Sequence, residues 1–221
     1  MSAPDVLLVR PPDARALLVL AHGAGAGMRH PFLQSIAEAL AAERVATLRY
    51  QFPYMEAGGR RPDPPAVAEA AVCVAVGKAR AMAPDLPLFA GGKSFGGRMT
   101  STAQAHAPLD GVGGLVFLGF PLHPAGRPGT ARAAHLERVT IPMLFLQGTR
   151  DALAALDLMR PVCDPLGARA TLHVVDGADH SFAVLKRSGR THQEVLRELA
   201  GVTAAWMLAT TDDRSPTTDR G

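Results

Sequence analysis

The sequence predicts one α/β domain in which a mostly parallel sheet is covered by helices on both faces. Apolar runs alternate with segments whose apolar residues recur at helical spacing. An apolar run without polar alternation is typical of a strand buried on both faces, as in a parallel sheet. The chain has 221 residues, 48% hydrophobic and 19% charged, which is enough for one well-filled core. The apolar runs are residues 17–20, 45–50, 88–91, 112–118, 143–146 and 170–175.

The first 65 residues should contain three strands and one helix. Residues 6–9 are predicted to be an edge strand, and residues 17–20 the strand that leads into a glycine-rich loop, residues 22–27. Pro31 suits a first helical turn, so a helix should begin there, followed by the strand at residues 45–50. Residues 51–65 hold four prolines and two glycines and should be an exposed loop. The predicted buried face of the helix is Phe32, Leu33, Ile36, Ala37 and Leu40.

The remaining chain continues the alternation. Helices are expected over residues 66–82, behind Ser94, over residues 152–159 and near the C-terminus. From Thr210 onward the sequence has no core residue, so we expect a domain over residues 1–209 and a disordered polar tail over residues 210–221. The predicted apolar face is Val67, Ala71, Val74 and Ala75 in the first of these helices, and Val195, Leu199, Val202 and Trp206 in the last.

Composition and charge exclude several classes of protein. The formal net charge is only +3, without a block of lysine or arginine, so nucleic acid is not an expected partner. Cys73 and Cys163 are too few for a disulfide scaffold or a metal site, and they suit a reducing compartment. The first ten residues lack the features of a signal peptide, and no apolar run is long enough to span a membrane. These observations predict a cytoplasmic protein without a membrane partner.

The motif around Ser94 is the main indication of a reactive residue in the sequence. An apolar run ends in Gly92-Lys93-Ser94-Phe95-Gly96, and a predicted helix follows at once. A serine in Gly-x-Ser-x-Gly between a strand and a helix lies on a sharp turn that exposes its hydroxyl. The small neighbours are needed because the turn brings strand and helix very close. We give Lys93 no chemical role and expect it to pack or hydrogen-bond near the turn.

The residues Gly92-Lys93-Ser94 also resemble the end of a phosphate-binding P-loop. That motif requires a glycine five positions before Gly92, where this chain has Pro87, and residues 88–91 have the pattern of a strand rather than a loop. The nucleotide-binding alternative is therefore disfavoured.

A serine nucleophile needs a base, and the base needs a carboxylate to orient it. On a doubly wound sheet both should lie in loops at the carboxyl ends of later strands. Asp151 follows the strand at residues 143–146, and His180 follows the strand at residues 170–175. The order serine, acid, histidine is that of one known class of catalytic triad. Asp179 competes with Asp151, but it adjoins His180 in sequence and should point elsewhere.

These residues and motifs resemble those of the α/β-hydrolases, over nearly the whole chain from Leu17 to Trp206. The chain is most similar to the compact dienelactone-hydrolase-like group. Within it, residues 22–27, residues 52–55 and Gly92-Lys93-Ser94 resemble a branch that includes a subunit of the NSL histone-acetylating complex and testis-expressed hydrolase-like proteins. The resemblance implies a single-domain α/β-hydrolase fold without a cap domain.

The resemblance also implies the roles of the site residues. Ser94 would be the nucleophile, His180 the general base and then acid, and Asp151 its orienting carboxylate. The backbone N–H groups of Phe95 and Ala24 would form the oxyanion hole. True dienelactone hydrolases use cysteine where this chain has Ser94, which argues against a lactone substrate. His22 should brace the glycine-rich loop.

The size of the substrate is indicated by the segment at residues 121–140, where larger hydrolases insert a cap. Twenty residues with three prolines form a loop and not a lid, so the site should be open. The expected reaction is hydrolysis of small or short-acyl esters, or of thioesters, through an acyl-enzyme, without a metal or an organic cofactor. The expected apolar wall of the site is Phe52, Tyr54, Leu122 and Phe182.

The main alternative is a catalytically silent binding or scaffolding module of the same fold, which the resemblance to a chromatin-complex subunit permits. A scaffold has no need to keep all three triad positions together with a glycine-rich loop. The complete set therefore favours an enzyme.

Overall fold

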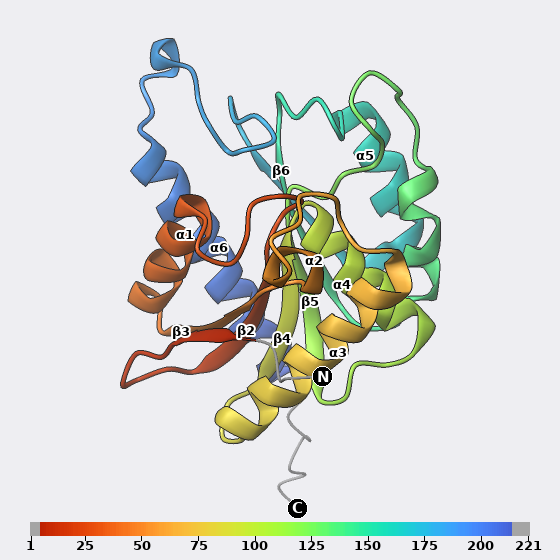
Figure 1. Ribbon diagram of the computed structural model, residues 1–221. Coiled ribbons are helices and arrows are strands. Elements are labelled where there is room, and N and C mark those ends of the chain that lie inside the picture. The colour runs from red at the N-terminus through yellow and green to blue at the C-terminus, as the bar shows by residue number, and fades with distance from the viewer. Residues whose placement is uncertain (1–4, 214–221) are drawn as a thin grey trace, which may run out of the picture.

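Seven strands form one sheet within residues 5–213, the part of the chain that the computed structural model describes (Figure 1). The first strand is antiparallel to its neighbour, and all other neighbours are parallel. The predicted mostly parallel sheet is therefore confirmed. In spatial order the strands are β1 (Val6–Val9), β3 (Val45–Tyr50), β2 (Ala16–Ala21), β4 (Leu88–Lys93), β5 (Val112–Leu118), β6 (Met143–Gly148) and β7 (Ala170–Val175).

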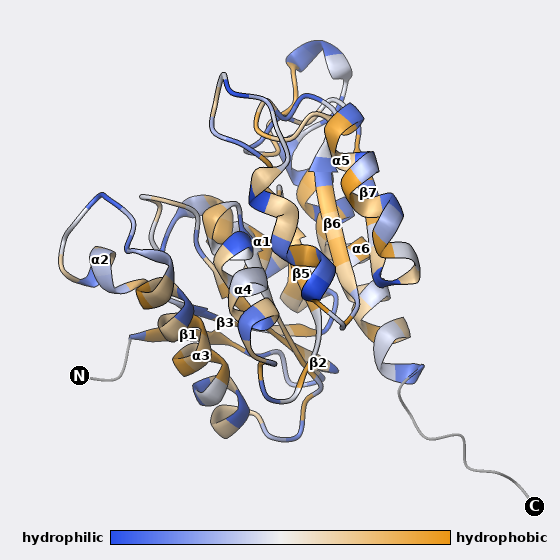
Figure 2. Ribbon diagram, turned by 90° about the vertical axis from the view of Figure 1, so that its right-hand side faces the viewer, coloured by the Kyte–Doolittle hydropathy of each residue, from blue (hydrophilic) through white to orange (hydrophobic). Residues whose placement is uncertain are grey.

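Helices cover both faces of this sheet, as the sequence predicts. One face packs against α1 (Pro31–Ala42) and α6 (His192–Asp212), and the other against α3 (Pro65–Met82), α4 (Phe95–His106) and α5 (Leu156–Cys163). Figure 2 shows β5 and β6 as apolar strands between helices that carry both polar and apolar residues. The shorter segments are α2 (Pro53–Glu56), η1 (Ala131–Arg138), η2 (Asp164–Arg169) and η3 (Lys186–Ser188).

The order of the strands brings four loops together at one edge. β2 and β4 are parallel neighbours, with Ala21 opposite Gly92, although a strand and three helices separate them in sequence. β6 and β7 are likewise paired, with Gly148 opposite Val175. The carboxyl ends of parallel strands lie at the same edge, and the crevice where the strand order reverses is a common place for a ligand site. The loops after β2, β4, β6 and β7 therefore meet.

The helix at residues 65–82 turns a different face to the core than its sequence predicts. Val67 and Val74 are 42% and 47% exposed, whereas Ala71 and Ala75 are buried as expected. Apolar residues occur all around this helix, so periodicity could not select one face. The small alanines lie against the sheet, where they allow a close approach of the two backbones. The buried residues of α3 are Ala68, Ala71, Val72, Ala75, Val76 and Ala79.

Three further boundaries differ from the predictions. Residues 53–56 form a short helix whose Tyr54 is buried, so the segment after β3 is not simply an exposed loop. α5 begins at Leu156 and not at residue 152, because the Asp151 carboxylate accepts the Leu153 N–H and holds the preceding residues in a turn. α6 continues to Asp212, beyond the expected domain end at residue 209. The rest of the predicted tail, residues 214–221, lies outside the described residues. Across residues 5–213 no helix combines the length and apolar character needed to cross a membrane.

Candidate active site

Ser94 lies on the sharp turn between β4 and α4. Its backbone has φ 51° and ψ −113°, a region that non-glycine residues rarely occupy and that stores strain. A Cβ atom on Gly92 would lie 2.3 Å from the Ala21 carbonyl oxygen, and one on Gly96 would lie 2.6 Å from the His22 carbonyl oxygen. Only glycine fits at either position, which explains the spacing of the motif. The Ser94 side chain is left partly exposed at the carboxyl edge of the sheet.

His180 lies between Ser94 and Asp151. Its Nε2 atom is 2.8 Å from Ser94 Oγ, and its Nδ1 atom is 2.7 Å from Asp151 Oδ2. A carboxylate only accepts hydrogen bonds, so we assign the ring proton to Nδ1, which leaves Nε2 free to accept the serine proton. The three residues that the sequence singles out thus form one chain of hydrogen bonds. They come from loops that are 86 and 29 residues apart in sequence.

The Asp151 carboxylate is fully engaged. Its side chain is 0% exposed, and Oδ2 accepts from Gln147 Nε2 at 2.6 Å as well as from His180. Oδ1 accepts from the Leu153 N–H at 2.8 Å. These donors compensate for burial of the charge and fix its orientation. Sequence reasoning gave Gln147 no role. Its only signal was a polar side chain at the end of an apolar strand.

The loops that carry Asp151 and His180 are tied to each other. The Arg150 N–H donates to the Ala178 carbonyl at 2.9 Å, and the Thr149 N–H donates to the Val175 carbonyl at 3.1 Å. Asp179 Oδ1 accepts from the Ser181 and Ala183 N–H groups, so this carboxylate closes its own loop. Asp179 is therefore engaged within its own loop, and Asp151 is the carboxylate within hydrogen-bond distance of the imidazole.

The glycine-rich loop after β2 is held by two aromatic residues from the segment after β3. His22 Nε2 accepts the Phe52 N–H at 3.1 Å, so its Nδ1 carries the proton and donates to the Gly23 carbonyl at 2.8 Å. Tyr54 Oη accepts the Gly25 N–H at 2.8 Å. His22 is completely buried, and burial lowers its pKa, which keeps the ring neutral.

This arrangement also fixes the peptide that contains the Ala24 N–H. The Gly23–Ala24 peptide is trans, so its N–H points opposite to the carbonyl that His22 holds. The Phe95 N–H is the first of α4 and has no partner within that helix. Among the described residues, neither N–H donates a hydrogen bond to a protein acceptor outside regular structure. Of the two residues, Ala24 lines the same cavity as Ser94.

A cavity of about 290 Å³ opens in front of Ser94 and His180. Its apolar part comes from the loop after β2, from the start of α1 and from Leu153. None of the predicted wall residues lines it. Phe52, Leu122 and Phe182 are 0% exposed and Tyr54 is 6% exposed, because these rings and side chains fill the cores beneath the loops. The lining is Gly23, Ala24, Ala26, His30, Phe32, Leu33, Lys93, Ser94, Leu153, His180 and Ser181.

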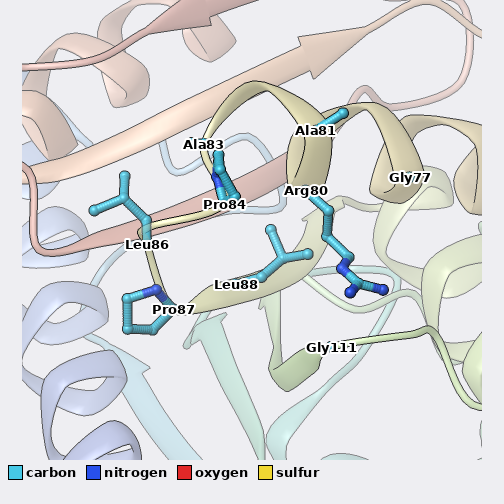
Figure 3. Close-up of a pocket in the computed structure, with 9 residues that line it drawn as sticks. All are labelled: Gly77, Arg80, Ala81, Ala83, Pro84, Leu86, Pro87, Leu88 and Gly111. Carbon is cyan, nitrogen blue, oxygen red and sulfur yellow. The ribbon is translucent and has the colours of Figure 1, made fainter.

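A larger hollow of about 530 Å³ lies at the opposite edge of the sheet, between the end of α3 and the starts of β4 and β5 (Figure 3). Arg80 is the only charged residue that lines it, and this guanidinium pairs with Asp110. The lining contains no nucleophile and no base. The hollow in front of Ser94 is therefore the candidate active site.

A second contact between a serine and a histidine lies outside this site. Ser101 Oγ donates to the Arg98 carbonyl at 2.9 Å, so the His135 Nε2 atom 2.7 Å away must donate to the serine rather than accept its proton. Burial and the nearby charges of Arg98 and Arg138 lower the pKa of His135 to about 4. This pair braces α4 and does not activate the hydroxyl.

The chain belongs to the α/β-hydrolase family. The family described as "Alpha/beta hydrolase domain" matches residues 14–208. A dienelactone hydrolase from Anabaena variabilis has a similar structure, with a TM-score of 0.71 and 20% identity over 94% of this chain and 99% of that chain. Est1E from Butyrivibrio proteoclasticus gives a TM-score of 0.69 and 16% identity over 92% and 94% of the two chains. An α/β serine hydrolase without a lid from Xanthomonas campestris gives 0.68 and 20% identity over 97% and 91%.

Proposed function

We propose that this protein is a serine hydrolase that cleaves small or short-acyl esters, or thioesters, through an acyl-enzyme. The observation that carries the proposal is the hydrogen-bonded chain from Ser94 through His180 to Asp151. A serine hydroxyl becomes nucleophilic when a neutral imidazole accepts its proton, and a buried carboxylate stabilises the imidazolium that results. Membership of the α/β-hydrolase family supports the same class of reaction.

The reaction would proceed in two halves. Ser94 Oγ attacks the ester carbonyl while His180 Nε2 takes the hydroxyl proton, and the proton then passes to the leaving alcohol or thiol. Water attacks the acyl-enzyme next and gives a proton to the same nitrogen, which passes it to Ser94 Oγ as the bond between this oxygen and the acyl carbon breaks and the acid is released. The Ala24 and Phe95 N–H groups would stabilise the oxyanion of each intermediate, and one such donor is worth about 10²–10³ in kcat in other hydrolases.

The cavity supports a small substrate. About 290 Å³ is at the lower limit of ordinary ligand pockets, and its apolar lining by Phe32, Leu33 and Leu153 suits a short acyl chain better than a charged group. The segment over residues 121–140 forms a loop and η1 but no cap, in agreement with an open site. The partner that we propose is a small-molecule ester, and we propose neither nucleic acid nor a membrane as a further partner. The location that we propose is the cytoplasm. Selectivity for long acyl chains would argue against this size class.

We further propose that the chain belongs to the branch suggested by its motifs, the one that includes a chromatin-complex subunit. The support is that two of these motifs contact each other, because His22 and Gly25 are hydrogen-bonded to Phe52 and Tyr54. Because that branch includes a subunit of a chromatin complex, a catalytically silent scaffold of the same fold is the alternative function.

The two functions are separated by intact mass measurement after exposure to a fluorophosphonate. The native chain should gain one adduct, and Ser94→Ala should gain none, because only an activated serine attacks this phosphorus centre. A well-folded native chain that forms no adduct would overturn the hydrolase and favour the scaffold.

A further inference from the structure

Lys93, the residue immediately before Ser94, does not extend into solvent as most lysines do. Its Nζ atom donates to the His180 backbone carbonyl at 2.5 Å. The ammonium also lies 5.5 Å from the centroid of the Phe182 ring, which stacks on Phe32. A side chain from the turn that carries the nucleophile therefore supports the loop that carries the base.

The lysine ammonium is close to the hydrogen bond between His180 and Asp151. A Cβ atom built on Gly119 would lie 3.1 Å from Lys93 Nζ, 3.4 Å from His180 Nδ1 and 3.5 Å from Asp151 Oδ2. The three polar atoms thus border one small space beside Gly119. Gly119 itself has φ 69°, a backbone conformation that favours glycine, and a Cβ atom there would press on the lysine ammonium.

Keeping a charge at this position is costly. Among the described residues no carboxylate oxygen lies within ion-pair distance of Lys93 Nζ. Burial lowers the pKa of Lys93 from its ordinary value of 10.5 to about 8, although the charges of Asp151 and Asp179 act in the opposite direction. A group held where its charge is disfavoured, next to reacting atoms, is a candidate for a functional role.

We propose that Lys93 is a positioning residue for the reaction: its ammonium holds the His180 carbonyl and thereby keeps the imidazole directed at Ser94. The inference rests on the proposed function. The charged form matters because a charge-assisted hydrogen bond is roughly twice as strong as a neutral one. The role proposed for the lysine is exerted through the loop of the base, by way of its hydrogen bond to the His180 carbonyl.

The pH dependence follows from the groups around the ammonium. Asp151 faces it from the loop after β6, Asp179 and His180 from the loop after β7, and His30 lines the same cavity from the start of α1. Loss of the lysine proton near pH 8 should weaken the hold on the loop, so activity should decline above that pH. An arginine at this position would stay charged far beyond it.

The test is the rate constant of fluorophosphonate labelling between pH 6 and pH 10, for the native chain, Lys93→Met, Lys93→Arg and, as a matched control, the exposed Lys186→Met. The native rate should fall on the alkaline side with a midpoint near pH 8. Lys93→Met should be about 10- to 100-fold slower, and without that fall, because small displacements of a catalytic group have costs of this size. Lys93→Arg should recover part of the rate and keep it at high pH, and Lys186→Met should behave like the native chain.

A Lys93→Met variant that is labelled at the native rate, or that keeps the alkaline fall, would overturn the inference. Thermal unfolding verifies that each variant is folded. If the Lys93→Arg variant does not fold, the comparison of Lys93→Met with the native chain decides the inference. If the native chain is not labelled at all, the proposed function fails. The inference is then decided by the downfield NMR resonance of the His180 Nδ1–H: broadening in Lys93→Met supports it, and an unchanged resonance contradicts it.

Discussion

At the scale of single residues, the site depends on which carboxylate accepts the hydrogen bond from the imidazole N–H. Asp151 and Asp179 both follow strands at the carboxyl edge, and both accept backbone hydrogen bonds. Only Asp151 reaches His180 Nδ1, at 2.7 Å, and it is completely buried. The difference in environment makes the two residues a matched pair for mutation.

Asp151→Asn should lower kcat for a small ester by about 10⁴-fold, the size of this effect in other serine hydrolases, because an amide can present its own N–H to the imidazole and favour the wrong tautomer. Asp179→Asn should stay within about tenfold of the native chain, since an asparagine oxygen can still accept from Ser181 and Ala183. Steady-state kinetics with p-nitrophenyl acetate would measure both variants. A larger loss for Asp179→Asn would reverse the assignment of the orienting acid.

At the scale of elements, the loops around the site are held by a few contacts that can be tested one at a time. Tyr54 reaches from α2 to the loop after β2, where its hydroxyl fixes the Gly25 N–H beside Ala24. Gly119, after β5, leaves the space that the lysine, the imidazole and the carboxylate border. We expect both positions to affect activity through the placement of the backbone rather than through chemistry.

Tyr54→Phe should lower kcat by several-fold and the free energy of unfolding by about 1 kcal/mol, the usual net value of one hydrogen bond. Tyr50→Phe is the control, because the buried Tyr50 hydroxyl has no hydrogen-bond partner among the described residues. Its removal should be neutral or stabilising. Urea unfolding and ester hydrolysis of both variants would measure these effects, and equal losses in the two would contradict a role for the contact with Gly25.

Gly119→Ala should abolish most activity and destabilise the domain by more than about 1 kcal/mol, since it combines backbone strain at φ 69° with a methyl group between Lys93 and His180. Gly126→Ala has nearly the same strain, at φ 71°, but its Cβ would meet no atom within 4 Å. The control should therefore lose a similar amount of backbone stability and no activity. Equal activity of the two variants would show that the space beside Gly119 is not needed.

At the scale of the whole molecule, the partly buried Lys93 links stability to pH. The unfolded chain keeps the Lys93 proton up to about pH 10.5, whereas the folded chain releases it above about pH 8, so the unfolded state binds more protons between these values. This group alone therefore makes the folded state more stable as pH rises through that window. Below it, the charged lysine lowers stability.

Lys93→Met should accordingly be more stable than the native chain at pH 7, and the difference should shrink toward pH 9.5. Urea unfolding of both proteins at the two pH values would measure this difference in the free energy of unfolding. Because the other titrating groups are the same in both proteins, their contribution cancels in the comparison. A variant that is less stable at pH 7 would mean that the hydrogen bond to His180 outweighs the cost of burying the charge.

The sequence by itself determined the fold class, the strand order along the chain and the three central site residues. Apolar runs, turn residues and the serine motif are local patterns, and their positions at strand ends bring Ser94, Asp151 and His180 to one edge in any parallel sheet. Local patterns were sufficient because these features depend on backbone conformation and on hydropathy.

Only the tertiary structure decided the wall of the cavity, the buried face of α3 and the hydrogen-bond partners of Gln147 and Lys93. Phe52, Tyr54, Leu122 and Phe182 have the hydrophobicity of a substrate wall, yet they fill the cores below the loops. An apolar side chain is equally suited to a core and to a pocket, and a helix that is apolar all round has no unique inner face. Which atoms a side chain meets depends on loops distant in sequence, and this is why hydropathy and periodicity could not decide it.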